Sequence, residues 1–330
     1  MKGKNILEVI TVMNPTTTIA AIESIRSNIQ KVIIGKETVI DLILTSLIAG
    51  GHILLEDVPG TGKTVMAKSL AKSVSGAFSR IQFTPDLLPS DVTGLNYFNQ
   101  KAGEFVFREG PVFCNILLAD EINRATPRTQ SALLECMEEK QVTVDGVTHQ
   151  LAQPFFVIAT QNPIETSGTF PLPEAQLDRF LMQLSMGTPS KEEELALLER
   201  FLAGQPLETL SPVCTTEELI GLQQAYPSVY VHPSLLSYIA DLVQASRSHN
   251  QVVSGVSPRG TLALLKAVQA YAMIQNRDYV IPEDIKTVAV PVMAHRLVIN
   301  RGYGSLSSGR QIIESLLETV PLPTEDWSRP

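Results

Sequence analysis

The sequence has few of the residues that mark disulfide-rich or metal-binding proteins. Its 330 residues include only three cysteines, Cys114, Cys136 and Cys214, and five histidines. No Cys-x-x-Cys pair and no His-Glu-x-x-His spacing occurs, which argues against a structural metal site. Scattered cysteines in odd number also argue against a disulfide framework, and they favour buried thiols in a reducing compartment.

A long uninterrupted apolar run is also lacking. The longest apolar region, residues 39–55, contains Asp41 and His52. It therefore predicts a core helix followed by a strand and not a membrane span. The short apolar stretch near the start of the chain is broken by Glu8, which makes it a poor signal peptide. We expect a cytoplasmic protein without a membrane span.

An excess of positive charge is absent as well. The chain carries 26 basic and 34 acidic residues, for a net charge of −8. This balance argues mildly against sequence-independent binding to nucleic acid or to anionic membranes. Apolar residues make up 44% of the chain and charged residues 18%, which are ordinary globular values. The length suggests two domains.

The first part of the chain alternates apolar runs of strand character with helical patterns. This alternation predicts an α/β core with a parallel sheet covered by helices on both faces. The expected strands are 53–55, 78–83, 113–118, 155–160 and 180–186, and helices are expected across 17–49. Two segments interrupt the pattern and read as β-hairpins, 95–109 and 141–151, the second around Asp145-Gly146.

Beyond Pro189 the strand pattern stops and helical patterns continue almost to Glu318. Ser190 and Glu193 have the spacing of a capping box at the first of these helices. We therefore predict a nucleotide-binding core over 1–187 and a helical domain over 188–330 that ends in a Pro-rich tail, 320–330. The expected helices are 191–203, 215–225, 233–247, 258–275, 282–298 and 308–318.

A phosphate-binding loop is predicted between the strand at 53–55 and the following helix. Glycines at 60 and 62 allow the backbone to approach an anion and to adopt positive φ. The N–H groups of such a turn point at phosphates, Lys63 would reach the β- and γ-phosphates, and the Thr64 hydroxyl would ligate Mg²⁺. Asp57 stands where the strict pattern has glycine. The predicted nucleotide-binding residues are Pro59, Gly60, Thr61, Gly62, Lys63, Thr64 and Val65.

Polar residues follow two further predicted strands. Asp120 and Glu121 end one of them, and in an α/β sheet ligands bind beyond the carboxyl ends of the strands. Asp120 would hold Mg²⁺ and Glu121 would act as general base on the attacking water. Asn162 ends the next strand and could hold that water against the γ-phosphate. The pattern therefore predicts hydrolysis of a nucleoside triphosphate.

Taken together, these motifs resemble the MoxR family of AAA+ ATPases, a branch related to magnesium chelatase and the replicative helicases. The resemblance covers about residues 20–305 and includes Asp57. It is carried by the segments 56–64, 118–125, 127–135, 159–163 and 170–180 and by the sequence around Arg259.

The resemblance implies roles for individual residues. Lys63 and Thr64 correspond to the Walker A pair, Asp120 and Glu121 to the Walker B pair, and Asn162 to the first sensor. Arg179 corresponds to an arginine finger that serves the neighbouring subunit. Arg259 corresponds to the second sensor, acting on its own site or on a neighbour's. The hairpins resemble the helix-2 insert and the hairpin before the first sensor strand.

The family expectation is an ATP- and Mg²⁺-dependent hexameric ring that remodels protein clients, with a von Willebrand A domain protein as partner. A nucleic-acid motor is the main alternative, because related helicases line their pore with the same hairpins. The 141–151 hairpin has no Lys or Arg, which disfavours this alternative. A nucleotide-dependent switch is a third possibility, which Glu121 disfavours. We interpret Arg124 and Arg128 as structural, beside the N-cap of a helix at 127–139.

Overall fold

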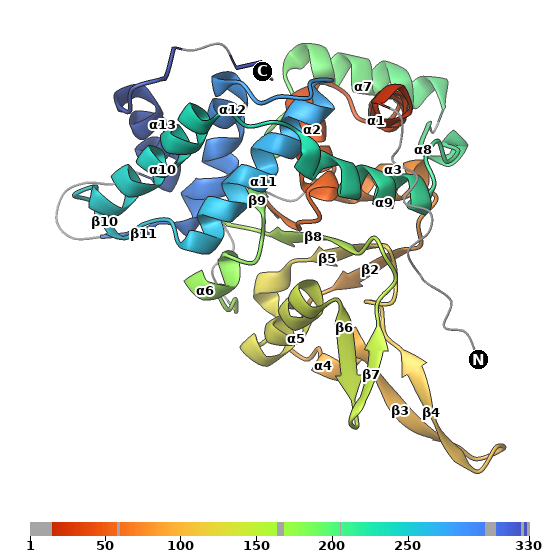
Figure 1. The fold of residues 1–330 in the computed structure, drawn as a ribbon. Helices are drawn as coiled ribbons and strands as arrows, with labels where there is room; N and C mark the ends of the chain where they lie inside the picture. The colour runs from red at the N-terminus through yellow and green to blue at the C-terminus, as the bar shows by residue number, and fades with distance from the viewer. Residues whose placement is uncertain are drawn as a thin grey trace, which may run out of the picture.

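The computed structural model describes residues 15–57, 60–163, 168–204, 206–300, 308–324 and 327–328. Figure 1 shows a sheet with helices on both faces, a helical layer above it, and two hairpins that extend away from it. The α/β architecture with a helical second part, predicted from the alternation of patterns, is confirmed.

The central sheet is parallel and has the order β2-β5-β8-β1-β9. All of its carboxyl ends therefore lie at one edge. The strands are β1 (Ile53–Glu56), β2 (Phe78–Gln82), β5 (Ile116–Asp120), β8 (Phe156–Gln161) and β9 (Met182–Leu184). In register, Gln82 pairs with Asp120 and Glu56 with Gln161, so polar residues of neighbouring strands meet at that edge.

Each face of the sheet has its own apolar core, because side chains alternate along a strand. Ile53, Leu55 and Ile158 belong to one core, which continues into the helical part of the chain. Leu54 and Val157 face the other core, together with residues of α5 (Pro127–Glu139). The first core also holds α1 (Pro15–Gln30), α2 (Glu37–Ile48) and α3 (Lys63–Ser73).

The predicted hairpins are both present. They are formed by β3 (Gly94–Asn99) with β4 (Glu104–Glu109), and by β6 (Gln141–Val144) with β7 (Val147–Gln150). Asn96 Nδ2 donates to Asp145 Oδ2 at 2.7 Å, and the rings of Phe107 and His149 stack with their centroids 4.0 Å apart. Contacts therefore join the two hairpins, with β3 touching the turn between β6 and β7, and β4 touching β7.

The helical part follows the sequence pattern closely. It consists of α7 (Lys191–Ala203), α8 (Pro206–Thr209), α9 (Thr216–Ala225), α10 (Pro233–Ser248), α11 (Pro258–Ile274), α12 (Pro282–Met293) and α13 (Gly309–Thr319). The capping box of Ser190 and Glu193 is present at α7. Short helices α4 (Pro89–Thr93) and α6 (Glu174–Leu177) complete the core part.

Three expectations from the sequence are wrong in detail. The strand expected at 180–186 is formed only by Met182–Leu184, because the Phe180 N–H closes a turn to Leu177 and the Met186 N–H donates to the Asp57 carboxylate. The strand expected at 113–118 runs over Ile116–Asp120, because the N–H groups of Phe113 and Cys114 form turn hydrogen bonds before it. The helix expected to reach 298 ends at Met293, since β11 (Val298–Ile299) pairs with β10 (Val252–Ser254) instead of continuing the helix. No helix among the described residues is long and apolar enough to cross a membrane.

Candidate functional site

The loop between β1 and α3 has the geometry of an anion-binding turn. Gly60 and Gly62 both have positive φ, +88° and +89°, and a Cβ at either position would meet nothing within 4 Å. Gly62 is the N-cap of α3 and Lys63 is its first residue. The N-terminus of α3 therefore opens toward any phosphate held by the loop. The Lys63 ammonium donates to the Asp57 carbonyl at 2.8 Å. The predicted binding residue Pro59 lies outside the described residues.

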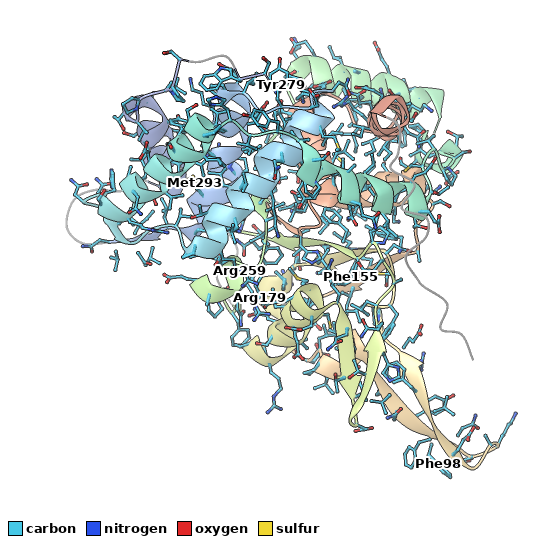
Figure 2. The ribbon with its side chains drawn as sticks, in the orientation of Figure 1. Phe98, Phe155, Arg179, Arg259, Tyr279 and Met293 are labelled. Atoms are coloured by element: carbon cyan, nitrogen blue, oxygen red, sulfur yellow. The ribbon has the colours of Figure 1, made fainter. Side chains whose placement is uncertain are left out.

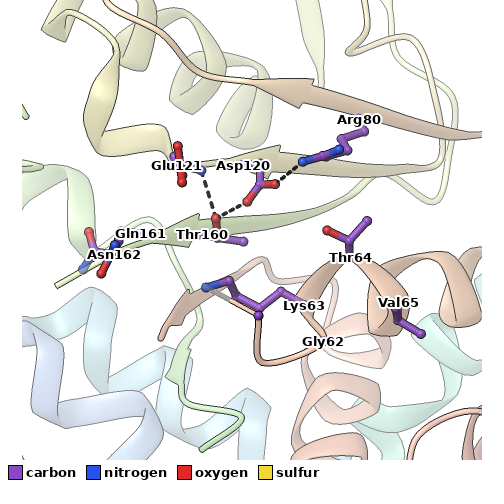
Figure 3. A pocket seen from close by; sticks show the side chains of 11 residues that line it. Gly62, Lys63, Thr64, Val65, Arg80, Asp120, Glu121, Thr160, Gln161 and Asn162 are labelled. Atoms are coloured by element: carbon purple, nitrogen blue, oxygen red, sulfur yellow. Dashed lines mark hydrogen bonds and ion pairs between the residues drawn. The ribbon is translucent and has the colours of Figure 1, made fainter. Parts of the chain in front are cut away.

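A cavity of about 380 Å³ lies in front of this loop at the carboxyl edge of the sheet. Figure 3 shows Lys63 and Thr64 on one side of it, with Asp120 and Glu121 opposite. The structure thus brings together residues from four separate segments. The lining consists of Gly60, Gly62, Lys63, Thr64, Val65, Arg80, Asp120, Glu121, Thr160, Gln161 and Asn162, and Thr61 is not part of it.

Asp120 is a nearly buried carboxylate, 9% exposed, at the end of β5. Its Oδ1 accepts from the Thr160 hydroxyl at 2.6 Å, and its Oδ2 pairs with the Arg80 guanidinium at 2.7 Å. One carboxylate oxygen therefore already faces a cation within the cavity. A carboxylate and the Thr64 hydroxyl in one cavity are the hard oxygen ligands that suit Mg²⁺. The donor set fits this metal.

Glu121 is held by two side chains that the sequence patterns did not single out for catalysis. Its Oε2 accepts from Gln82 Nε2 at 2.7 Å and pairs with Arg124 Nε at 2.9 Å. Its backbone is left-handed, φ +56°, and its N–H donates to the Thr160 hydroxyl at 2.9 Å. Arg124, which we interpreted as structural, contacts this predicted catalytic acid.

Arg80, Gln82 and Thr160 also take part in this candidate site, and the sequence motifs assign none of them a role. A signal for them exists, because the polar residues at 80 and 82 alternate along β2, next to the strand that carries Asp120. Recognising this signal requires the strand order, which places β2 beside β5 although 33 residues separate Gln82 from Ile116.

The two arginines with predicted catalytic roles lie elsewhere and close to each other. Neither Arg179 nor Arg259 lines the cavity that contains Lys63. Glu138 on α5 bridges them: its carboxylate pairs with Arg179 Nη1 at 3.0 Å and with Arg259. Figure 2 shows both arginines at the junction of the sheet and the helical layer. Arg179 also donates to the Leu134 carbonyl at 2.9 Å.

Basic side chains surround this arginine pair. A second cavity of about 350 Å³ is lined by both arginines and, among others, by Lys140, Lys266 and Arg296. The side chains of Arg179 and Arg259 are 31% and 48% exposed, so both are open to solvent on the side away from Glu138. We refer to the face formed by Arg179, Arg259, Lys140 and Lys266 as the arginine face.

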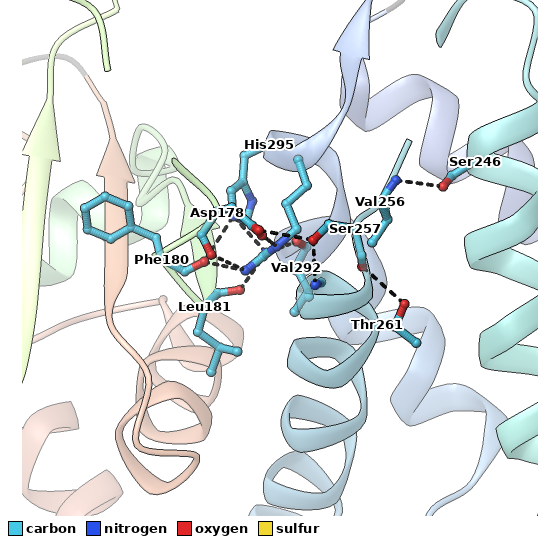
Figure 4. Close-up of polar contacts among 11 residues, drawn as sticks. Asp178, Phe180, Leu181, Ser246, Val256, Ser257, Thr261, Val292 and His295 are labelled. Atoms are coloured by element: carbon cyan, nitrogen blue, oxygen red, sulfur yellow. Dashed lines mark hydrogen bonds and ion pairs between the residues drawn. The ribbon is translucent and has the colours of Figure 1, made fainter. Parts of the chain in front are cut away.

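Asp178 fastens the backbone under the arginine face. Its carboxylate accepts from Arg296 Nε at 2.6 Å. It also accepts from the Ser257 hydroxyl at 3.1 Å, and Figure 4 shows Asp178 and Ser257 next to each other. Burial lowers the pKa of the Arg296 guanidinium, although the charge of Asp178 acts in the opposite direction. Ser257 is the N-cap of α11, the helix that carries Arg259. Arg179 and Arg259 are therefore held in a common frame that joins the sheet to the helical part.

The cysteines take no part in the site. Cys114, Cys136 and Cys214 are buried, and burial raises the pKa of each thiol to about 12. Such thiols remain protonated and unreactive at neutral pH. The predicted role of the cysteines as small buried side chains is confirmed.

Comparison with known proteins identifies the two parts of the chain. Residues 52–182 match the family model described as "ATPase family associated with various cellular activities (AAA)". Residues 244–316 match the model of the AAA lid domain. Both matches agree with the arrangement of a parallel sheet followed by a helical part.

Whole-length relatives narrow the assignment. The chain is 56% identical to the Bacillus subtilis protein YeaC, over 90% of this chain and 93% of the relative. It is 42% identical to Chaperone MoxR1 of Mycobacterium tuberculosis, over 89% and 80%. Identity with Protein MoxR of Paracoccus denitrificans is 31%, over 88% and 93%.

A solved structure from Cytophaga hutchinsonii, described there as a "putative ATPase", superimposes on this fold with a TM-score of 0.86. It shares 40% sequence identity and the match covers 94% of this chain and 97% of the other. With the sheet order, the glycine loop in front of α3 and these relatives in agreement, the chain belongs to the MoxR family of AAA+ ATPases.

Proposed function

We propose that this chain hydrolyses ATP within a ring of identical subunits and uses the energy to remodel protein clients. The observation that carries the proposal is the separation of two half-sites on one subunit. The cavity at Lys63 holds the groups that bind and activate, and the arginine face lies outside that cavity. The core over 1–187 and the lid over 188–330 are our proposed functional domains.

In the proposed reaction, ATP binds with its phosphates on the loop at 60–65. Lys63 leaves the Asp57 carbonyl and binds the β- and γ-phosphates, and Asn162 orients the attacking water. Thr64 and Asp120 would hold Mg²⁺, which supplies neutralisation of charge on the β- and γ-phosphate oxygens. Arg80 must then release one oxygen of Asp120, and its exposed side chain can turn toward solvent or phosphate.

Glu121 is the proposed general base. Gln82 and Arg124 both engage its Oε2 oxygen. We propose that these two contacts give way when the carboxylate takes the proton of the attacking water. Glu121 lines the cavity and these two partners do not, so the attacking water would approach the carboxylate from the cavity side. The described arrangement would then be a resting one, in which these two contacts fix the position of the base.

The arginine face is proposed to complete the site of the next subunit. A guanidinium at the γ-phosphate stabilises the transition state and typically accelerates hydrolysis by about 10³–10⁵. Since Glu138 joins Arg179 to Arg259, both would enter the same neighbouring site, so we propose that Arg259 acts in trans as well. Such head-to-tail contacts close into a ring. The family suggests six subunits.

The hairpins are the proposed contact with the client. Tyr97, Phe98 and Phe105 on β3–β4 are 43%, 52% and 73% exposed, and Figure 2 shows Phe98 at the far tip. Exposed aromatic side chains on a projecting element favour binding to apolar segments of a protein. The hairpins carry too few basic residues to follow a phosphate backbone. A von Willebrand A domain protein is the partner that the family suggests.

Sedimentation with and without ATP and Mg²⁺ tests the ring. We expect monomers without nucleotide and a single larger species with ATP, most clearly for Glu121→Gln, which should bind ATP without hydrolysing it. A strictly monomeric wild-type protein with full ATPase activity would rule out any role for the arginine face in trans.

A further inference from the structure

Asp57 is the residue that departs from the strict phosphate-loop pattern, and its side chain is buried, only 6% exposed. Its carboxylate does not face the phosphate cavity, whose lining does not include it. A buried carboxylate is costly unless donors satisfy it, so its partners show what it is for.

Three donors satisfy that carboxylate, and all come from one short segment. Asp57 Oδ1 accepts from the Ser185 hydroxyl at 2.7 Å and from the Gly187 N–H at 3.2 Å. Its Oδ2 accepts from the Met186 N–H at 2.6 Å. Residues 185–187, which we term the connector, follow β9 and lead to α7 at the start of the helical part.

The backbone of Asp57 faces the nucleotide side. Its carbonyl accepts from Lys63 Nζ at 2.8 Å, and its N–H donates to the Gln161 carbonyl at 3.3 Å, directly before Asn162. The adjacent Glu56 carboxylate accepts from Gln161 Nε2 at 2.9 Å and from Gln183 Nε2 at 2.6 Å. One dipeptide thus fastens the ends of β1, β8 and β9 together.

We propose that Asp57 is a positioning residue that transmits the nucleotide state of the phosphate loop to the connector, and through it to the lid of the same subunit. The proposal rests on the proposed function, because it requires that Lys63 exchanges the Asp57 carbonyl for a phosphate. The carbonyl that accepts from Lys63 and the carboxylate that accepts from Met186 and Gly187 belong to the same residue. A shift of the backbone at Asp57 therefore also moves its carboxylate. Glycine at position 57, as the strict pattern has it, would bind phosphate without this link.

Asp57→Asn tests the link, because it keeps the shape but leaves one acceptor oxygen for three donors. Its matched control is Asp241→Asn, which removes the same charge at an exposed position on α10. Hydrogen exchange is measured by mass spectrometry, with and without ADP and with a non-hydrolysable ATP analogue. In the wild type and the control, nucleotide should slow exchange both at residues 60–65 and at the connector, by about threefold or more.

In Asp57→Asn, nucleotide should still slow exchange at 60–65 but should no longer change it at the connector. The KM for ATP should stay within about threefold while kcat falls about tenfold. If nucleotide slowed hydrogen exchange at the connector of Asp57→Asn as much as in the wild type, the proposal would be overturned. Loss of nucleotide binding in this variant would also overturn it, because Asp57 would then be needed to form the loop itself.

A second variant keeps the test decisive if Asp57→Asn fails to fold. Ser185→Ala removes one donor from the other side of the same contact, and it should reduce the nucleotide-dependent change at the connector by about half. An unchanged response in Ser185→Ala would count against the link. Failure of the proposed function gives a different result, namely a wild-type protein that binds nucleotide with connector slowing but does not hydrolyse ATP.

Discussion

Mixing two inactive variants can decide whether the arginine face acts on a neighbouring subunit. Glu121→Gln removes the proposed base and Arg179→Ala removes the proposed finger. Each variant alone should lose about 10³-fold or more of the ATPase rate. If each site takes its base from one subunit and its finger from the next, a mixed ring contains some sites with both groups intact.

The recovered activity follows from the geometry. In an equal mixture that assembles at random, a site needs an intact Glu121 in one subunit and an intact Arg179 in the next, so about one quarter of the wild-type activity should return. The subunits are mixed as monomers before ATP is added, and phosphate release is measured. Absence of any recovery, in rings shown by sedimentation to contain both variants, would refute the assignment of Arg179 in trans.

The same design settles the side on which Arg259 acts. Glu138 holds it against Arg179, so both should come from one neighbour. A mixture of Arg179→Ala with Arg259→Ala should then recover nothing, because no neighbour supplies both guanidiniums. If Arg259 served its own site, the mixture would recover about one quarter. The mixture of Glu121→Gln with Arg259→Ala serves as an internal check. It should recover about one quarter of the wild-type activity if Arg259 acts on the neighbour's site, and nothing if Arg259 acts on its own site.

Three further outcomes are expected. Lys63→Ala should weaken ATP binding by about tenfold or more, measured by titration with a fluorescent ATP analogue, since a direct charge-assisted contact is lost; unchanged affinity would contradict the assignment of the loop. The double variant Phe98→Ala/Phe105→Ala should keep basal ATPase activity within about twofold, but an unfolded client polypeptide should no longer stimulate it. Single-stranded DNA should stimulate neither the wild type nor the double variant. Equal stimulation of the wild type and the double variant by the client would contradict the proposed role of the hairpin. Burial lowers the pKa of His52 from 6.5 to about 4. The unfolded chain therefore binds more protons between these values, and the free energy of unfolding without nucleotide should fall by about 2 kcal/mol from pH 7 to pH 5; denaturant curves that coincide at the two pH values would contradict this.

Much of the fold could be predicted from the sequence because its signals are local. The run Ile53–Leu55 determines a strand, the glycines at 60 and 62 permit a phosphate loop, and the turn at Asp145-Gly146 determines a hairpin. Each of these signals lies within a few residues. The prediction of a helix over 282–298 is wrong for its last residues, because Val298 and Ile299 pair with the distant strand β10. Helical periodicity contains no signal for such a pairing.

The site divides in the same way. Lys63, Thr64, Asp120, Glu121 and Asn162 line one cavity, and each could be located from the strand that precedes it. Their catalytic roles stay predictions until the variants above are measured. The partners of Glu121 could not be located, because Gln82 reaches it only through the pairing of β2 with β5.

By itself, the sequence determined which groups line the candidate site, because a phosphate loop and a strand end are contiguous pieces of backbone. Only the tertiary structure decided how those groups are held. It brought Arg179 and Arg259 together on Glu138, across 80 residues of chain, and it gave the carboxylate of Asp57 its donors at 185–187. Such contacts depend on strand order and on the packing of the helical part against the sheet, which set distances that no local spacing contains.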